Sequence, residues 1–150
     1  MIFRFGKRLI SYEMFDVSGK EILHRTAVAE GKVVFSNEGF VHLQEKGSKK
    51  GSIQEMAEIA GIMGAKETSR LLPLCHPLPL HKVKVELTTL PESHSILVQA
   101  TAITDAKTGV EMEALTAVSI SCLTIYDMCK SFDSSMIIQD IKLLSKLKEK

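Results

Sequence analysis

The stretch HKVKVELTTLPESHSILVQATAIT, residues 81–104, has the pattern of two strands joined by a turn. In its first part the apolar residues Val83, Val85 and Leu87 alternate with charged residues, and this period of two indicates a strand buried on one face. The run PESH, with its proline and polar residues, favours a turn, and SILVQATAIT behind it predicts a second strand. The stretch therefore predicts two consecutive strands of a sheet.

Two more strands and three helices are predicted around this stretch. Short-period segments rich in β-branched residues predict the strands. Apolar residues at intervals of three and four predict the helices, and the longest helix is apolar over most of its surface. In chain order the predictions are a strand over 24–35, helices over 36–46 and 53–72, and, beyond the central stretch, a helix over 110–132 and a strand over 136–144 with a charged tail over 145–150.

The order strand, helices, strand, strand, helix, strand predicts an α+β fold. It is the split βαβ, or ferredoxin-like, pattern, in which helices pack on one face of an antiparallel sheet. A chain of 150 residues with 45% hydrophobic content has the size and core of one domain. Because no internal repeat or linker interrupts it, we expect residues 1–150 to form a single domain.

The composition argues against several classes of partner. A net charge of +1 with 5% aromatic residues and no tryptophan does not suit a nucleic-acid binder. We read no membrane span, since no uninterrupted apolar run approaches about 18 residues, and no signal peptide in the opening residues. Three cysteines, an odd number, favour a reducing compartment. The expected location is the cytoplasm.

Asp127 and Lys130 are the first candidates for chemistry. They end a run, residues 114–126, that contains no charged residue, and an i, i+3 spacing makes them neighbours on a helix. Such a pair can be a structural ion pair or a proton-transfer pair, and the sequence favours neither. Glu111 and Glu113 lie at the start of the same helix, where the helix dipole alone is an adequate explanation for acidic residues.

Basic residues elsewhere could bind an anion. Lys50 precedes Gly51 at the start of a predicted helix, where backbone N–H groups and the dipole favour a phosphate or carboxylate. The motif is weak, and a solvated loop is the more common explanation for such a pattern. Lys66 and Arg25 could add charge to such a site or simply lie on the surface.

The run LCHPL, residues 74–78, places Cys75 beside His76. A zinc site needs three or four ligands at characteristic spacings, and the chain has no C-x-x-C or H-E-x-x-H motif, so we expect no structural metal. Adjacent residues of an extended loop project in different directions, which argues against a nucleophile paired with its base. We interpret Cys75 as a packed residue and His76 as a ligand contact on a loop.

Three longer stretches together closely resemble the MoaC family of cyclic pyranopterin monophosphate synthases, from about Met14 to Lys146. They are MFDVSGK, LLPLCHPLPLHKVKVEL and KTGVEMEALTAVSISCLTIYDMCK. The resemblance implies a ferredoxin-like domain assembled as a hexamer, a trimer of dimers with active sites shared between subunits. It also implies a phosphorus–oxygen lyase that converts 3′,8-cyclo-7,8-dihydroguanosine 5′-triphosphate to cyclic pyranopterin monophosphate and diphosphate. No tightly bound cofactor is implied, although Mg²⁺ is an expected companion of the substrate phosphates.

The resemblance also implies roles for individual residues. Lys50 and His76, with Lys66, would hold the triphosphate. Asp127 and Lys130 would move protons, and Met112 with Glu113 would seat the guanine-derived base. The implied catalytic residues are Asp127 and Lys130 of YDMCK and Lys50 of KKG, and the implied substrate-binding residues are Leu74, Cys75, His76, Met112 and Glu113, with Glu111, Lys66 and Arg25 as further pocket positions.

The sequence departs from the family pattern around these residues. The loop at 48–52 reads SKKGS, where the family usually has histidines before the lysine and an aspartate after the glycine. Glu67 and Ser69 replace an arginine and a tryptophan, and LKEK replaces a glycine- and lysine-rich tail. A catalytically weakened homologue that only binds nucleotides is therefore an alternative. Glu113 and Asp127 share a helical stripe but lie about 21 Å apart along it, which favours an active site shared between subunits.

Overall fold

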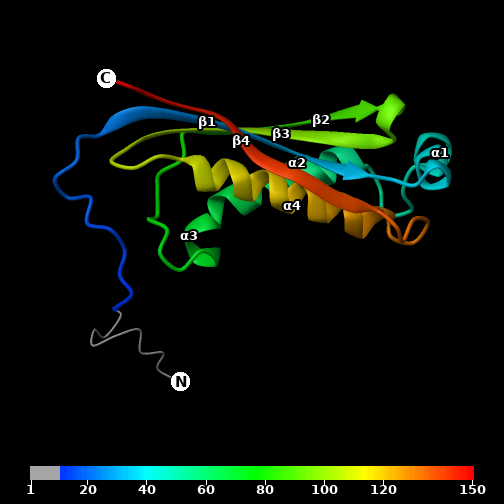
Figure 1. Ribbon diagram of the computed structural model, residues 1–150, viewed down its shortest axis with the longest axis horizontal. Helices are drawn as coiled ribbons and strands as arrows, with labels where there is room; N and C mark the ends of the chain where they lie inside the picture. The colour runs from blue at the N-terminus through cyan, green and yellow to red at the C-terminus, as the bar shows by residue number, and fades with distance from the viewer. Residues whose placement is uncertain (1–10) are drawn as a thin grey trace.

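The computed structural model of the chain describes residues 11–150 (Figure 1). The prediction that no signal peptide is present rests largely on earlier residues and lies outside the described ones. In chain order the elements are β1 (Leu23–Val34), α1 (Asn37–Lys46), α2 (Ile53–Lys66), α3 (Thr68–Leu71), β2 (Lys82–Leu90), a 3-10 turn (Pro91–Ser93), β3 (Ser95–Ala106), α4 (Glu111–Cys129) and β4 (Ile137–Glu149).

The four strands form one antiparallel sheet in the order β2-β3-β1-β4. The stretch at 81–104 is the hairpin β2–β3, closed by the 3-10 turn and by His94 in the left-handed conformation. Strand β1 pairs with β3 on one side and with β4 on the other. The central strands are therefore β1 and β3, and the edge strands are β2 and β4. This order and pairing confirm the predicted ferredoxin-like split βαβ fold.

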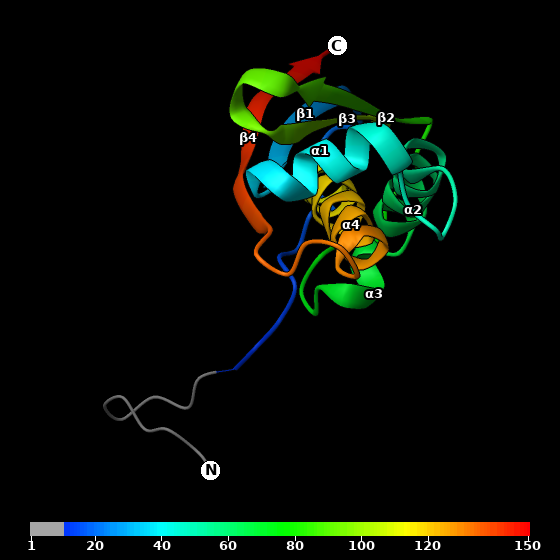
Figure 2. The same cartoon turned by 90° about the vertical axis from the view of Figure 1, so that its right-hand side faces the viewer.

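Helices α2 and α4 lie side by side beneath one face of the sheet, while α1 lies at one end (Figure 2). Small strand residues such as Ala29 and Ala100, both fully buried, let α4 approach the sheet closely. Gly61 of α2 serves the same purpose against α4, because a Cβ there would lie 2.2 Å from the Ser121 hydroxyl oxygen. That hydroxyl donates to the Ala57 carbonyl at 2.8 Å and fixes the two helices to each other.

By length and composition alone, α4 is long and apolar enough to cross a membrane, and it is the one such helix among residues 11–150. Half of its apolar window is buried within the fold, and Val118 and Ile125 have no exposed surface. The packing is therefore that of a core helix between the sheet and α2.

Two boundaries differ from the predictions by more than three residues. The helix predicted over 53–72 divides at Glu67 into α2 and α3, and the buried Thr68 hydroxyl bonds back to the carbonyls of Gly64 and Ala65. The predicted tail over 145–150 is wrong, since β4 continues to Glu149 opposite His24 of β1. Charged side chains are compatible with a strand at the edge of a sheet, where they stay in water, so charge alone was a poor sign of a tail.

Candidate functional site

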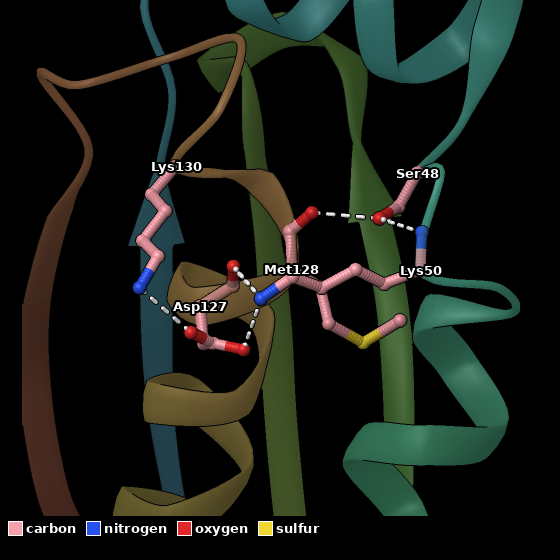
Figure 3. Close-up of polar contacts among 5 residues, drawn as sticks. All are labelled: Ser48, Lys50, Asp127, Met128 and Lys130. Carbon is pink, nitrogen blue, oxygen red and sulfur yellow. Dashed lines mark hydrogen bonds and ion pairs between the residues drawn. The ribbon is translucent and has the colours of Figure 1, made fainter.

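Lys50, Asp127 and Lys130 meet at the C-terminal end of α4 (Figure 3). One carboxylate oxygen of Asp127 lies 2.7 Å from the Lys50 ammonium, and the other lies 2.9 Å from the Lys130 ammonium. Lys50 also donates to the Asp127 backbone carbonyl at 3.2 Å. The structure thus brings together the three residues to which the family resemblance assigned catalysis, one of them from 77 residues away.

The two ammonium groups lower the pKa of Asp127 to about 2, mainly through the hydrogen bonds from Lys50 and Lys130. Asp127 is therefore ionised at neutral pH, and the cluster carries one net positive charge. The side chains of Lys50, Asp127 and Lys130 are 51%, 54% and 58% exposed. Exposed ion pairs stabilise a fold little, so these three groups remain available to a ligand.

The loop between α1 and α2 determines where Lys50 lies. Gly47 ends α1 with its N–H bonded to the Leu43 carbonyl, and Gly51 adopts φ +112°, a conformation that favours glycine. Ser52 then caps α2 by accepting from the Glu55 N–H at 3.3 Å. The Lys50 ammonium then reaches across to α4 and donates to the Asp127 carboxylate at 2.7 Å.

A cavity of about 670 Å³ lies at the other end of α4. The loop before β2 forms one wall, and the first turn of α4 with the Thr108–Gly109 turn forms another. Five predicted substrate residues line it: Leu74, Cys75, His76, Glu111 and Met112. The His76 imidazole donates through Nε2 to the Phe15 carbonyl at 2.7 Å, which holds the N-terminal segment beside the cavity.

Glu113 lies in the protein interior and does not line the cavity. Its side chain is 3% exposed, and its Oε2 has no hydrogen-bond partner among the described residues. Burial raises the pKa of Glu113, and the nearby Glu111 raises it further. Burial, with a smaller effect from Glu113, also raises the pKa of the Cys75 thiol, which disfavours the thiolate that a nucleophile would need.

Arg25 and Lys66 occupy different surroundings from those predicted. The Arg25 guanidinium donates to the carbonyls of Ala106 and Lys107 at 2.9 and 3.1 Å, and so it holds the end of β3. It also lines a small cavity of about 240 Å³ with Glu111, which pairs with Lys146 at 3.1 Å. Lys66 is exposed at the end of α2 and belongs to neither the cluster nor these cavities within residues 11–150.

Apart from Arg25 and Lys66, the predicted residues form two half-sites. We call Lys50, Asp127 and Lys130 the cationic half-site, and the 670 Å³ cavity with Glu113 behind it the cavity half-site. Fourteen residues of helix separate Glu113 from Asp127, which is about 21 Å at 1.5 Å per residue. A single chain does not unite the two half-sites around one small substrate.

The structure adds residues that the sequence did not indicate. Tyr12, Thr108 and Gly109 line the cavity, but none lies in a motif with a recognisable ligand pattern. Lys146 pairs with Glu111 because the predicted tail is in fact strand β4. No group of three or more His, Cys, Asp or Glu side chains suited to a metal ion occurs among residues 11–150.

The comparisons with known proteins cover both half-sites. The model of the MoaC family matches residues 14–148. A protein of Cereibacter sphaeroides named cyclic pyranopterin monophosphate synthase is 52% identical over 136 residues, 91% of this chain and 86% of its own length. Proteins with the same name from Rhodospirillum rubrum and Helicobacter hepaticus are 51% and 50% identical over 133 residues, which is 89% of this chain and 80% and 84% of theirs.

Proposed function

The chain belongs to the MoaC family, and from this membership we propose that it converts 3′,8-cyclo-7,8-dihydroguanosine 5′-triphosphate to cyclic pyranopterin monophosphate with release of diphosphate. It is a lyase of molybdenum-cofactor biosynthesis, like its relatives named cyclic pyranopterin monophosphate synthase. The structural observation that supports this most is the cationic half-site, where a loop and a helix end place two lysines on one carboxylate. The alternative of a nucleotide-binding module gains no support from this intact cluster.

In this proposal the cationic half-site receives the phosphates of the substrate. Its net positive charge attracts them, and its two ammonium groups stabilise the charge that develops as diphosphate leaves. A phosphate that draws an ammonium away from Asp127 also removes one of the hydrogen bonds that lower the pKa of that carboxyl. Asp127 thereby becomes a better proton acceptor only when substrate is bound, and Lys130 beside it is the natural proton donor.

The cavity half-site would hold the guanine-derived ring system. Its walls are mostly apolar, with His76 and Glu111 as polar groups, which suits a flat heterocycle with a polar edge. The unpartnered oxygen of Glu113 lies behind this cavity and could accept a hydrogen bond from a ring N–H once the side chains around it adjust. Mg²⁺, in this proposal, enters with the substrate phosphates and is not held by ligands of the chain.

We further propose that the two half-sites combine across subunits of a homo-oligomer, a hexamer arranged as a trimer of dimers. Two observations support this. The two half-sites lie at opposite ends of α4 in one chain, and α2 exposes an apolar stripe of Met56, Ile59 and Met63 that a second chain could cover. The cytoplasm remains the proposed location, and the three unpaired cysteines are compatible with it.

A single-turnover assay tests the proposed function. The protein is mixed with the cyclised dihydro-GTP precursor and Mg²⁺, and both diphosphate and the pyranopterin monophosphate are followed by mass spectrometry. We expect both products, and we expect Lys130→Ala to abolish them without unfolding the protein. Binding of the precursor with no diphosphate would instead establish the nucleotide-binding alternative.

A further inference from the structure

Ser48 contacts the end of α4 at the point where the cationic half-site is built. Its hydroxyl donates to the Met128 carbonyl at 2.6 Å and accepts from the backbone N–H of Lys50 at 3.1 Å (Figure 3). The same oxygen therefore joins the loop that carries Lys50 to the helix that carries Asp127. Ser48 is half-buried and belongs to neither the cavity nor the ion-paired cluster.

The chemistry of a helix end explains why this contact is stable. The last four carbonyls of a helix have no partner within it and need donors from elsewhere. In α4 the Tyr126 carbonyl accepts from the Lys130 N–H, and the Cys129 carbonyl accepts from the two backbone N–H groups of residues 132 and 133. The loop supplies the other two donors, since Lys50 binds the Asp127 carbonyl and Ser48 binds the Met128 carbonyl.

The loop thus caps α4 with two adjacent bonds, one from a flexible ammonium and one from a short hydroxyl. The ammonium reaches its place through four rotatable bonds, whereas a single rotatable bond joins the Ser48 hydroxyl to the backbone, so its contact fixes that backbone more directly. Gly51, with φ +112°, and the isolated bridge between Ser48 and Gly51 keep the turn tight around Lys50. Without the Ser48 hydroxyl, Lys50 would keep its charge, but its backbone would no longer be held in a fixed position against α4.

We propose that Ser48 is a positioning residue that places Lys50 on Asp127 by capping α4 through Met128. This inference rests on the proposed function, because it concerns how Lys50 is positioned in the same cationic half-site. It assigns Ser48 no contact with the substrate. It also gives a physical reason why the loop at 48–52 can lack the family's usual histidines and aspartate and still present its lysine.

The test has two separate readouts on the full-length protein. Competitive labelling with a trace of acetic anhydride, read by fragment-ion mass spectrometry, gives the reactivity of the Lys50 amine relative to the neighbouring exposed Lys49. Ser48→Ala should raise this ratio by up to about tenfold, the equilibrium factor that one net hydrogen bond corresponds to. The turnover assay gives kcat/KM, which should fall by a similar factor, because the misplaced Lys50 is the group proposed to receive the substrate phosphates and to stabilise the charge that develops on them.

Two variants serve as controls. Ser52→Ala removes a hydroxyl from the same loop, but that hydroxyl caps α2 and forms no hydrogen bond with α4 among the described residues, so both readouts should stay near those of the unmodified protein. Ser48→Thr keeps a hydroxyl at the same atom and should restore the low Lys50 reactivity. An unchanged Lys50 ratio in Ser48→Ala, or an equal rise in Ser52→Ala, would overturn the positioning role. Failure of the unmodified protein to release diphosphate would instead overturn the proposed function and leave the labelling result valid.

Discussion

Replacing Glu113 by glutamine should make the fold more stable at neutral pH while it impairs catalysis. The side chain is 3% exposed, one carboxylate oxygen has no partner, and burial raises its pKa above the ordinary value of 4.5. An unpaired buried polar group costs about 1–3 kcal/mol, and more when it is charged. Glu113→Gln removes the charge at nearly constant volume. We therefore expect a gain of about 1–3 kcal/mol in the free energy of unfolding at pH 8.

The gain depends on pH in a direction that follows from the raised pKa. Well above the folded-state pKa, the carboxylate is ionised in both states and the folded chain bears the full cost of burying it. As pH falls through the folded-state pKa, the folded carboxyl takes up a proton and the cost shrinks. At pH 4, below the ordinary value of 4.5, the carboxyl is mostly protonated in both states, so the variant and the unmodified protein should be almost equally stable.

Urea denaturation at pH 8 and at pH 4 measures this difference. With slopes of about 1–3 kcal/mol per molar urea, the expected gain moves the midpoint at pH 8 upward by about 1 M, and the two curves should converge at pH 4. Turnover of Glu113→Gln should fall, because the carboxyl is proposed to accept from the substrate ring. A variant that is destabilised at pH 8, or whose gain persists unchanged at pH 4, would refute the assignment of Glu113 as an unpartnered buried acid.

Three further substitutions test the elements that build the cationic half-site. Asp127→Asn should abolish turnover yet shift Tm by no more than about 2 °C, because exposed ion pairs add little stability; a large loss of Tm would mean that the cluster is structural. Gly51→Ala should lower the free energy of unfolding by about 1–3 kcal/mol, since φ is +112° at this position, and it should reduce turnover by displacing the adjacent Lys50. A variant with the Tm and kcat of the unmodified protein would contradict this strain. Gly61→Ala should lower the free energy of unfolding by about 1–3 kcal/mol, because the new methyl group forces α2 away from α4. Ser121→Ala in the same chain should relieve part of this loss. If the two substitutions lowered the free energy of unfolding additively, the close approach of Gly61 to Ser121 would be contradicted.

The fold was predictable because its signals are local and mutually consistent. Each local pattern indicates one element: the alternation indicates β2, the turn residues precede β3, and the long apolar segment indicates α4. Their order along the chain is that of one common topology, the split βαβ fold. The misread tail shows the limit of such signals. LKEK is charged because β4 is an edge strand, and nothing within those residues reveals that β1 pairs with them.

The candidate site residues could be named from the sequence, but their arrangement could not. Local spacing made Asp127 and Lys130 neighbours, yet their contact with Lys50 depends on how α2 packs antiparallel to α4, which only the tertiary structure determines. A helical wheel placed Glu113 and Asp127 on one stripe, but the fold buries the first and exposes the second. Ser48 was visible only as a departure from a family pattern, because its partner is a backbone carbonyl that no sequence motif identifies.

The two half-sites are proposed to act together across subunits, and mixed oligomers test this pairing directly. Lys130→Ala damages the cationic half-site and His76→Ala damages the cavity half-site, so each variant alone should be inactive. When they are co-expressed in equal amounts and isolated as mixed oligomers, about one quarter of the sites should pair two intact halves and restore about one quarter of the turnover. A mixture of the double variant with unmodified chains should also give about one quarter. If each site lay within one chain, the first mixture would be inactive and the second would retain about half, and that result would contradict the account.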